Sequence, residues 1–292
     1  MSVKDEIIPI SVNFFYSRAC NYHCGYCFHA ENNLDKLPLE QVKKGLSLLR
    51  NKGMKKINFS GGEPFIFADD FLGPIIRYCK LELHLEYISI ISNGSLIKER
   101  WLNQFGKYID LLGISCDSFV PSTNKKIGRG NGEVVNFIFD IREWCYNYDI
   151  NFKVNTVVNT FNWQEDMNEH IARLNPHRWK CFQTLIIDGE NSGVDRQGRD
   201  GKLFYVDEHR FRHFIEVHKN QVSLVIEEND VMRNSYLLVD ENMCFLNCAD
   251  GGKKPTKSIL EVGVEKALLE SGYDEGAFQE RGGAYFLKEI QI

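Results

Sequence analysis

The sequence lacks any apolar run long enough to span a membrane, and it lacks the features of a secretion signal. The N-terminal segment MSVKDEIIPI contains two acidic residues and no succession of positive, apolar and small-residue regions. We therefore expect a cytoplasmic protein in a reducing compartment. Nine cysteines in such a place are more typical of thiols and metal ligands than of a disulfide framework.

The sequence also lacks a low-complexity linker and an excess of charge of one sign. Its 292 residues carry 35 basic and 40 acidic side chains, a net charge of −5. This balance argues against a surface that coats nucleic acid, although a small anionic ligand needs only a few basic groups. Hydrophobic residues make up 43% of the chain, enough for a substantial core, and the length suits one large domain or one domain with an appended lobe.

Short apolar runs alternate with stretches of helical period as far as residue 187. This alternation predicts an α/β fold with a parallel sheet, whose functional groups gather at the carboxyl ends of the strands. We expect one unit at 1–187 and a C-terminal extension at 188–292 that covers the mouth of the sheet. The expected strands are Ser11–Tyr16, Lys56–Phe59, Tyr87–Ser92, Leu111–Ser115, Phe152–Val158 and Trp179–Ile187, and the expected helices are Leu39–Lys52, Phe71–Cys79, Lys98–Tyr108, Val134–Tyr148 and Asp166–Leu174.

Three cysteines lie close together in the segment CNYHCGYC, directly after the first expected strand. Cys20, Cys24 and Cys27 have the spacing C-x3-C-x2-C. Structural zinc sites and ordinary iron–sulfur carriers use four ligands, whereas three thiolates on a four-iron cluster leave one iron open for an outside ligand. The alternative is a structural zinc site completed from the set His23, His29, Cys244 and Cys248.

The triplet, with an aromatic residue before its last cysteine, resembles the signature of radical S-adenosylmethionine (SAM) enzymes. The resemblance implies a partial (β/α)6 radical SAM barrel with a C-terminal extension. It also implies two cofactors, a 4Fe-4S cluster on the three cysteines and SAM on the open iron, and an external electron donor. The segment SGGEP at 60–64 is similar to the family's GGEP motif, which holds the SAM amino group.

Basic and polar residues share one face of three expected strands, because side chains alternate along a strand. Buried cations are unfavourable without anionic partners, so four of them around one cavity imply a strongly anionic ligand such as a phosphate chain. The alternative is that each lies in solvent at a strand end. The residues are Lys56, Asn58 and Ser60 on the second strand, Lys153 and Asn155 on the fifth, and Arg178 and Lys180 on the sixth.

The chain further resembles the viperins, a family of nucleotide-modifying radical SAM enzymes, from about Ser11 to Tyr285. Similar segments include CNYHCGYCFHA, KINFSGGEPF, SNGSLIKERW, ISCDSF, RWKCFQ, SYLLVDE and KSILEVGVE. The resemblance implies a dehydratase that converts a pyrimidine ribonucleoside triphosphate, CTP or UTP, to its 3′-deoxy-3′,4′-didehydro analogue. The reaction begins with hydrogen abstraction from the ribose 4′ carbon, and the product is an antiviral chain terminator of RNA synthesis.

The resemblance implies roles for individual residues. Tyr236 aligns with a tyrosine on the cover of the active site and is the expected catalytic residue. SAM is expected at Tyr26, Gly61, Gly62, Glu63, Asn93, Ser115 and Arg129. The triphosphate is expected at Lys56, Lys153, Arg178, Lys180 and Lys253, with the ribose and base near Asn13, Asn58, Ser60 and Asn155.

The sequence departs from the viperin pattern in three places. No amphipathic helix precedes the first strand, so we expect no membrane attachment. The chain ends in LKEIQI, without the tryptophan by which animal members recruit iron–sulfur assembly factors. Phe14 and Phe15 replace a Tyr-His pair near the base site, which leaves the choice of base open. We expect a monomer, and the remaining alternatives are a radical SAM enzyme for another phosphorylated substrate and a zinc-stabilised binding module.

Overall fold

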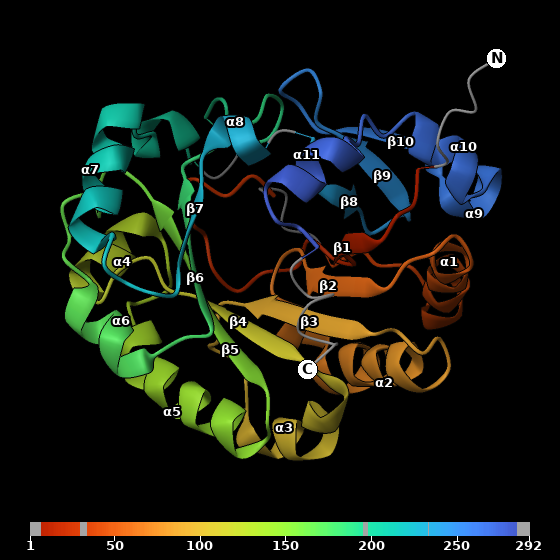
Figure 1. Ribbon diagram of the computed structural model, residues 1–292, viewed down its shortest axis with the longest axis horizontal. Coiled ribbons are helices and arrows are strands. Elements are labelled where there is room, and N and C mark those ends of the chain that lie inside the picture. The colour runs from red at the N-terminus through yellow and green to blue at the C-terminus, as the bar shows by residue number, and fades with distance from the viewer. Residues whose placement is uncertain (1–6, 30–33, 195–197, 233, 285–292) are drawn as a thin grey trace.

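The computed structural model describes residues 7–29, 34–194, 198–232 and 234–284. In this part of the chain one sheet has the strand order β10-β9-β8-β1-β2-β3-β4-β5-β6-β7. β1 to β6 are neighbours in chain order and pair in parallel, with helices on their outer side (Figure 1). The strands are β1 (Ser11–Phe15), β2 (Lys56–Ser60), β3 (Tyr87–Ser92), β4 (Leu111–Ser115), β5 (Asn151–Val158), β6 (Arg178–Gln183), β7 (Leu224–Glu227), β8 (Leu237–Val239), β9 (Cys244–Asn247) and β10 (Lys254–Ser258).

The predicted partial barrel of α/β class is confirmed, and the five expected helices are present with ends shifted by a few residues. They are α1, α2, α3, α5 and α6, and the short helix α4 after the fourth strand was not expected. The helices are α1 (Leu39–Asn51), α2 (Gly73–Leu81), α3 (Glu99–Phe105), α4 (Pro121–Ile127), α5 (Val134–Asn147), α6 (Asn168–Leu174), α7 (Glu208–His218), α8 (Asn229–Met232), α9 (Ile259–Val262), α10 (Val264–Leu269) and α11 (Glu275–Glu280).

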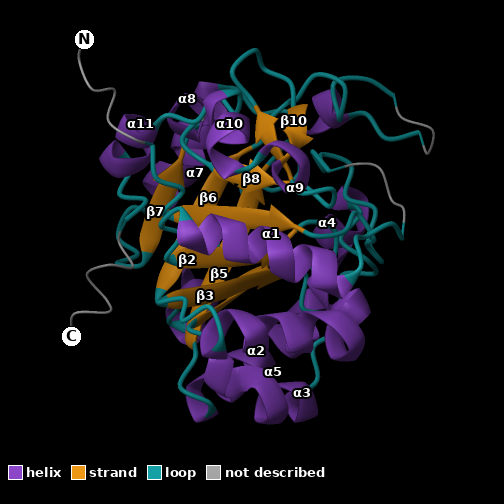
Figure 2. Cartoon of the chain, turned by 90° about the vertical axis from the view of Figure 1, so that its right-hand side faces the viewer, coloured by secondary structure: helices purple, strands orange, loops and turns teal. Residues whose placement is uncertain are grey.

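The central strands turn an apolar face outward, and β1, β2, β5 and β6 turn polar residues inward. On β1, Val12 and Phe14 are fully buried in the core, while Asn13 between them lines the interior cavity. The outer faces pack against helices such as α1, which buries Val42 and Leu46. Figure 2 shows these helices stacked outside the strands, and long loops gathered where the strand arrows end. The alternation thus sends the polar residues of the motifs toward one interior space.

The chain after residue 187 extends the sheet at both edges. β7 pairs in parallel with β6, and β8 pairs in parallel with β1 through Val12 and Leu237. β9 and β10 follow as antiparallel strands beyond β8. Both parts of the chain therefore share one sheet, and the division into units at residue 188 stays a prediction. The first six residues and the terminal segment LKEIQI lie outside the described residues.

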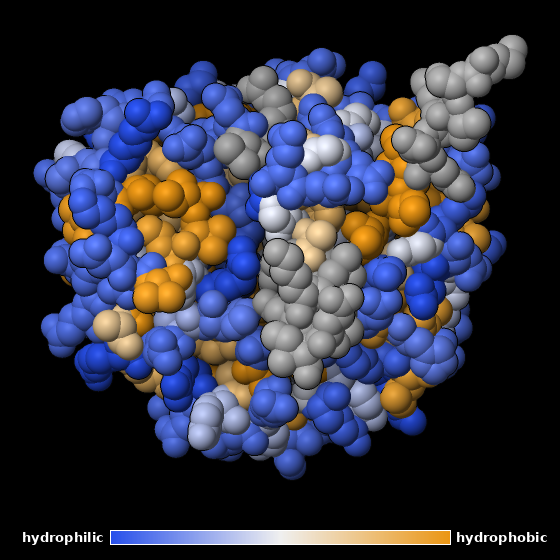
Figure 3. All heavy atoms as spheres, in the orientation of Figure 1, coloured by the Kyte–Doolittle hydropathy of each residue, from blue (hydrophilic) through white to orange (hydrophobic). Residues whose placement is uncertain are grey.

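One face of the molecule is mostly hydrophilic, with hydrophobic side chains gathered in a hollow left of its centre (Figure 3). Exposed apolar residues of the described chain include Val217 at the end of α7, Val222 in the following loop, and Ile226 on the edge strand β7.

Candidate active site

The inner face of the sheet and the loops at its carboxyl ends enclose a cavity of about 420 Å³. The structure brings most of the predicted site residues to its wall. Three of them, Glu63, Arg178 and Lys253, are not part of the lining. The predicted residues that line it are Asn13, Cys20, Cys24, Tyr26, Cys27, Lys56, Asn58, Ser60, Gly61, Gly62, Asn93, Ser115, Arg129, Lys153, Asn155, Lys180 and Tyr236.

The cysteine loop follows β1 and is held in place by the end of α4. The backbone N–H of His23 donates to Gly128 O at 3.2 Å, and that of Gly25 donates to Ile127 O at 3.0 Å. Gly25 has no room for a side chain, because a Cβ there would lie 2.1 Å from the ring of Phe204. Burial raises the pKa of Cys20 to about 11 and that of Cys24 to about 12.

The GGEP loop lies against the start of the cysteine loop. Gly61 has a φ of +118°, and a Cβ on Gly62 would lie 1.9 Å from Ala19 O, so neither position accepts a side chain without a shift. Glu63 is buried, and its carboxylate accepts hydrogen bonds from Ser92 Oγ (2.7 Å) and from the backbone N–H of Asn93 (2.7 Å).

Burial raises the pKa of Glu63, although these hydrogen bonds oppose the rise. Through its hydrogen bonds with Ser92 and Asn93, Glu63 connects the GGEP loop to the end of β3. Its predicted contact with the SAM amino group stays a prediction.

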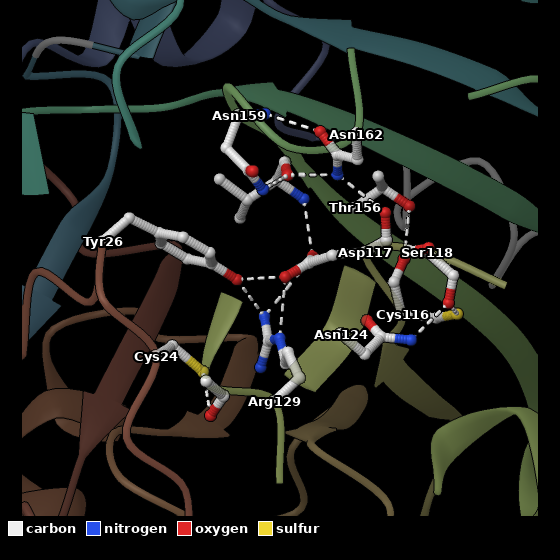
Figure 4. Close-up of polar contacts among 12 residues, drawn as sticks. Cys24, Tyr26, Cys116, Asp117, Ser118, Asn124, Arg129, Thr156, Asn159 and Asn162 are labelled. Carbon is white, nitrogen blue, oxygen red and sulfur yellow. Dashed lines mark hydrogen bonds and ion pairs between the residues drawn. The ribbon is translucent and has the colours of Figure 1, made fainter. Parts of the chain in front are cut away.

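Arg129, predicted for the SAM carboxylate, is held by a buried acid that sequence analysis did not single out (Figure 4). Its Nε donates to Asp117 Oδ2 at 2.8 Å, and its Nη2 donates to the hydroxyl of Tyr26 at 2.6 Å. The Tyr26 hydroxyl in turn donates to Asp117, which is fully buried and accepts the Val157 N–H at 2.9 Å. Burial lowers the pKa of Arg129, but Asp117, Cys24 and Tyr26 together outweigh this and raise it, so the guanidinium keeps its charge.

Three lysines line the cavity from the inner faces of β2, β5 and β6. Lys56 opens β2, whereas Lys153 and Lys180 are third in β5 and β6, so all three precede the carboxyl ends of their strands. All three are buried. Burial lowers the pKa of Lys153 well below its usual range, and the charges of Lys180 and Lys56 lower it further. Arg178 is outside the lining but also lowers the pKa of Lys153, so it contributes to the same positive field.

A polar ribbon crosses the sheet one step nearer the carboxyl ends. Ser89 Oγ donates to Asn58 Oδ1 at 2.8 Å, and Asn58 Nδ2 donates to Asn13 Oδ1 at 3.0 Å. Asn155 lies at the corresponding step of β5, and its buried Oδ1 has no hydrogen-bond partner among the described residues. These amide groups offer donors and acceptors to a ligand with hydroxyl groups.

Lys253 was predicted for the triphosphate, but the structure places its ammonium in an ion pair. Its Nζ lies 2.7 Å from Glu190 Oε1, donates to Phe28 O at 2.7 Å, and lies 3.3 Å from Nδ1 of His29. Burial lowers the pKa of Lys253, while Glu190 acts in the opposite direction. Its predicted role in substrate binding stays a prediction.

Tyr236 lies beside Lys180, one of the three lysines that line the cavity. Lys180 Nζ donates to the Tyr236 hydroxyl at 3.1 Å, and the Arg281 guanidinium carbon lies 3.7 Å from the centre of the Tyr236 ring. Sequence analysis missed Arg281, which lines the cavity from the end of α11, as well as Asp117 and Glu227. Asp117 lies two residues after β4, so its place near a carboxyl end was a usable signal. Arg281 and Glu227 carry no local signal, because tertiary structure alone brings them to the site.

The cysteine loop fits the ligand set of an iron–sulfur cluster. All nine cysteines are free, and the three of the loop line the same cavity. No group of three His, Cys, Asp or Glu among the described residues could hold a single metal ion. A cluster has no such need, because each of the three cysteines binds a different iron and the fourth iron is open to SAM. The nearby glycine loop and the charged guanidinium suit the amino and carboxylate groups of SAM.

Comparison with known proteins places the chain in a family. The family model described as "Radical SAM superfamily" matches residues 14–190 of this chain. The chain is 51% identical over 280 residues to the S-adenosylmethionine-dependent nucleotide dehydratase RSAD2 of Oncorhynchus mykiss, covering 95% of this chain and 80% of that protein. It is 33% identical over 291 residues to the S-adenosylmethionine-dependent nucleotide dehydratase of Flammeovirga pacifica, covering 96% of this chain and 97% of that protein.

Among solved structures, Streptococcus suis SuiB bound to S-adenosylmethionine has a TM-score of 0.66 at 15% identity, covering 93% of this chain and 67% of that chain. This likeness concerns the fold alone. In the described part of the chain, no helix has the length and apolar character needed to cross a membrane.

The family match decides against the structural zinc alternative and gives a 4Fe-4S cluster and SAM as the cofactors. The chain belongs to the radical SAM superfamily and, within it, to the family of S-adenosylmethionine-dependent nucleotide dehydratases.

Proposed function

We propose that the protein removes water from the ribose of CTP or UTP and releases the 3′-deoxy-3′,4′-didehydro nucleotide, a terminator of RNA chains. The observation that best supports this is the order of groups along the inner strand faces. On β2, Lys56, Asn58 and Ser60 succeed one another toward the cysteine loop, and on β5 Lys153 is followed by Asn155. Two residues of a strand span roughly 6.6 Å.

This spacing matches the parts of a nucleotide. A phosphate chain at the lysines leaves the ribose at the level of the asparagines, between the lysines and the cofactor end of the cavity. The cations neutralise the phosphates and fix the sugar, which positions the 4′ carbon. Arg178 and Lys253 complete the proposed phosphate-binding set.

The cysteine loop would hold the cluster and Arg129 would hold SAM, and when bound this pair would supply the radical chemistry that removes the 4′ hydrogen atom. The 3′ hydroxyl then leaves with a proton as water, and one electron from an external donor completes the alkene. Tyr236 is the proposed catalytic residue, since its hydroxyl beside Lys180 holds a proton at the wall of the cavity.

Product analysis tests this function. The reduced holoenzyme is incubated without oxygen with SAM and each of the four ribonucleoside triphosphates, and the products are separated by mass. CTP or UTP should give a product lighter than the substrate by one water, together with 5′-deoxyadenosine. Formation of 5′-deoxyadenosine with no dehydrated nucleotide would point to another phosphorylated substrate.

The proposal extends to the protein's surroundings. Free cysteines throughout the chain suit a reducing compartment, and we place the protein in the cytoplasm. A small reducing protein or cofactor must supply the electron, and we expect the enzyme to act as a monomer without nucleic acid or membrane. Size-exclusion chromatography of the holoenzyme with light scattering checks the monomer.

A further inference from the structure

A buried carboxylate lies beside the basic residues Lys56, Lys153, Arg178 and Lys180, which are called the cation set. Glu227 ends the edge strand β7, opposite Phe182 of β6, and only 2% of its surface is exposed. A buried carboxylate is costly unless a cation balances it. Its position close to a predicted phosphate site needs an explanation, because an acid repels phosphate.

Glu227 pairs with one of the proposed phosphate ligands. Lys180 Nζ contacts Glu227 Oε1 in a buried ion pair, and the same Nζ donates to the Tyr236 hydroxyl at 3.1 Å. Glu227 therefore fixes the Lys180 ammonium beside the hydroxyl of Tyr236, the proposed catalytic residue. Burial acts to raise the pKa of Glu227, but Lys180 and Arg281 outweigh it and lower the pKa, so Glu227 is ionised at neutral pH.

The charges around Lys153 show what Glu227 does in the empty site. Lys180, Lys56 and Arg178 all disfavour the charged form of Lys153, and Glu227 favours it. Among the described groups with the strongest influence on Lys153, Glu227 alone is anionic. Without an anion the buried cations would repel one another, which would destabilise this end of the cavity.

We propose that Glu227 is a built-in anion that stands in for a phosphoryl group while the site is empty, and that it limits how tightly the site holds a phosphate chain. The inference rests on the proposed function and deepens it, because it assigns a specificity-determining residue to the phosphate site. When a triphosphate enters, Lys180 is shared between Glu227 and the ligand. The ammonium stays under Tyr236, so the phenol keeps its place during the reaction.

Substitution of Glu227 by glutamine tests the inference with inorganic tripolyphosphate as the probe. Glu227→Gln holoenzyme should bind tripolyphosphate about tenfold more tightly than the wild type in a calorimetric titration. Removal of the Glu227 charge removes its repulsion of the phosphates, and a tenfold change in affinity corresponds to only about 1.4 kcal/mol. Without ligand the variant should unfold at a lower temperature, and tripolyphosphate should raise its unfolding temperature by more than that of the wild type.

Three further variants separate charge from structure. Glu228→Gln changes the neighbouring acid and should leave affinity and stability as in the wild type. Lys180→Met should weaken tripolyphosphate binding. The double variant Lys180→Met/Glu227→Gln removes the pair as a neutral unit, and it should bind within a few-fold of the wild type. The double variant also serves if Glu227→Gln alone does not fold, because binding much weaker than the wild type would then contradict the inference.

A catalytic readout completes the test. Glu227→Gln should form fewer dehydrated nucleotides per 5′-deoxyadenosine, since Tyr236 loses its fixed neighbour. Equal or weaker tripolyphosphate binding by Glu227→Gln overturns the inference while the proposed function stands. Absence of tripolyphosphate binding and of triphosphate-stimulated SAM cleavage in the wild type would instead overturn the phosphate site and the proposed function with it.

Discussion

At the scale of single residues, the site is built from charges that hold one another. Arg129 is fixed by Asp117 and Tyr26, Lys180 by Glu227, and Lys253 by Glu190. Each cation is thereby oriented before any ligand arrives. Substitution of one partner leaves the other buried and unpaired, so stability and ligand binding must be measured together.

Arg129→Ala should therefore have two effects. SAM affinity should fall about tenfold or more, because a charged hydrogen bond to a carboxylate is lost. Stability should fall by about 3–5 kcal/mol, because Asp117 stays buried without its cation. Calorimetry with SAM and chemical denaturation measure the two, with iron content as a check on the cluster. The control Arg129→Met/Asp117→Asn should recover stability but not SAM affinity, and unchanged SAM affinity in Arg129→Ala would remove this residue from the cofactor site.

The lowered pKa of Lys153 predicts that the stability of the protein depends on pH. Its folded-state pKa is lowered from the usual value of 10.5 by burial and by neighbouring cations. Because the pKa of Lys153 is lower in the folded state than in the unfolded state, the contribution of this lysine to the free energy of unfolding is fully present above pH 10.5. It declines as the pH falls through the folded-state pKa, where the buried amine must take up a proton.

The negative charge of a bound triphosphate favours the protonated form of Lys153. Binding at about pH 9 should therefore be accompanied by the uptake of up to one proton at Lys153. Calorimetric titrations in two buffers of different ionisation enthalpy measure the uptake. Lys153→Met should bind with less uptake, and equal uptake in both proteins would assign the proton to another group.

At the scale of elements, the end of α4 connects the cysteine loop to the predicted SAM clamp. Gly128 caps α4 with a φ of +89°, and its carbonyl accepts the His23 N–H, while the next residue is Arg129. A Cβ on Gly128 would lie 2.2 Å from His23 O. Backbone atoms cannot move away as a flexible side chain can, so the cysteine loop must shift.

Gly128→Ala should consequently lower the iron content of the purified protein and weaken SAM binding. Gly263→Ala is the matched control, since Gly263 also has a positive φ, +81°, but nothing lies within 4 Å of a Cβ there. Both changes put a Cβ at a positive φ, which costs about 1–3 kcal/mol. Gly128 is left-handed with a ψ of 18°, whereas Gly263 has a ψ of 161°, so the stability of both variants is measured beside their iron content. Equal iron content in the two variants would show that the docking of α4 does not support the cluster.

The elements also show how far the sequence predicts the fold. The six central strands follow from apolar runs, and their inward faces follow from the two-residue period, so Lys56, Asn58 and Lys153 were expected where they lie. β7 and β8 have four and three residues, too few for a readable period, and they become strands because the edges of the sheet pair with them. Glu227 enters the site at the end of β7, and Arg281 enters it from the end of the short helix α11, which explains why they were missed.

At the scale of the whole molecule, we infer that one cavity holds a phosphate chain at one end and a radical-generating cofactor pair at the other. The stimulation of 5′-deoxyadenosine formation should then follow the number of phosphates. A ribonucleoside triphosphate should stimulate it most, the diphosphate less and the free nucleoside hardly at all, because each lost phosphoryl group leaves buried cations without an anion. Equal stimulation by nucleosides would contradict a phosphate site in the cavity.

The most direct test of the central claim is the fate of a deuterium atom on the ribose. CTP or UTP labelled at the 4′ carbon is incubated with the reduced holoenzyme and SAM, and 5′-deoxyadenosine is analysed by mass spectrometry. We expect the deuterium to appear in 5′-deoxyadenosine while the nucleotide loses one water. Label that stays in the nucleotide, or transfer from substrate labelled at another ribose position instead, would contradict it.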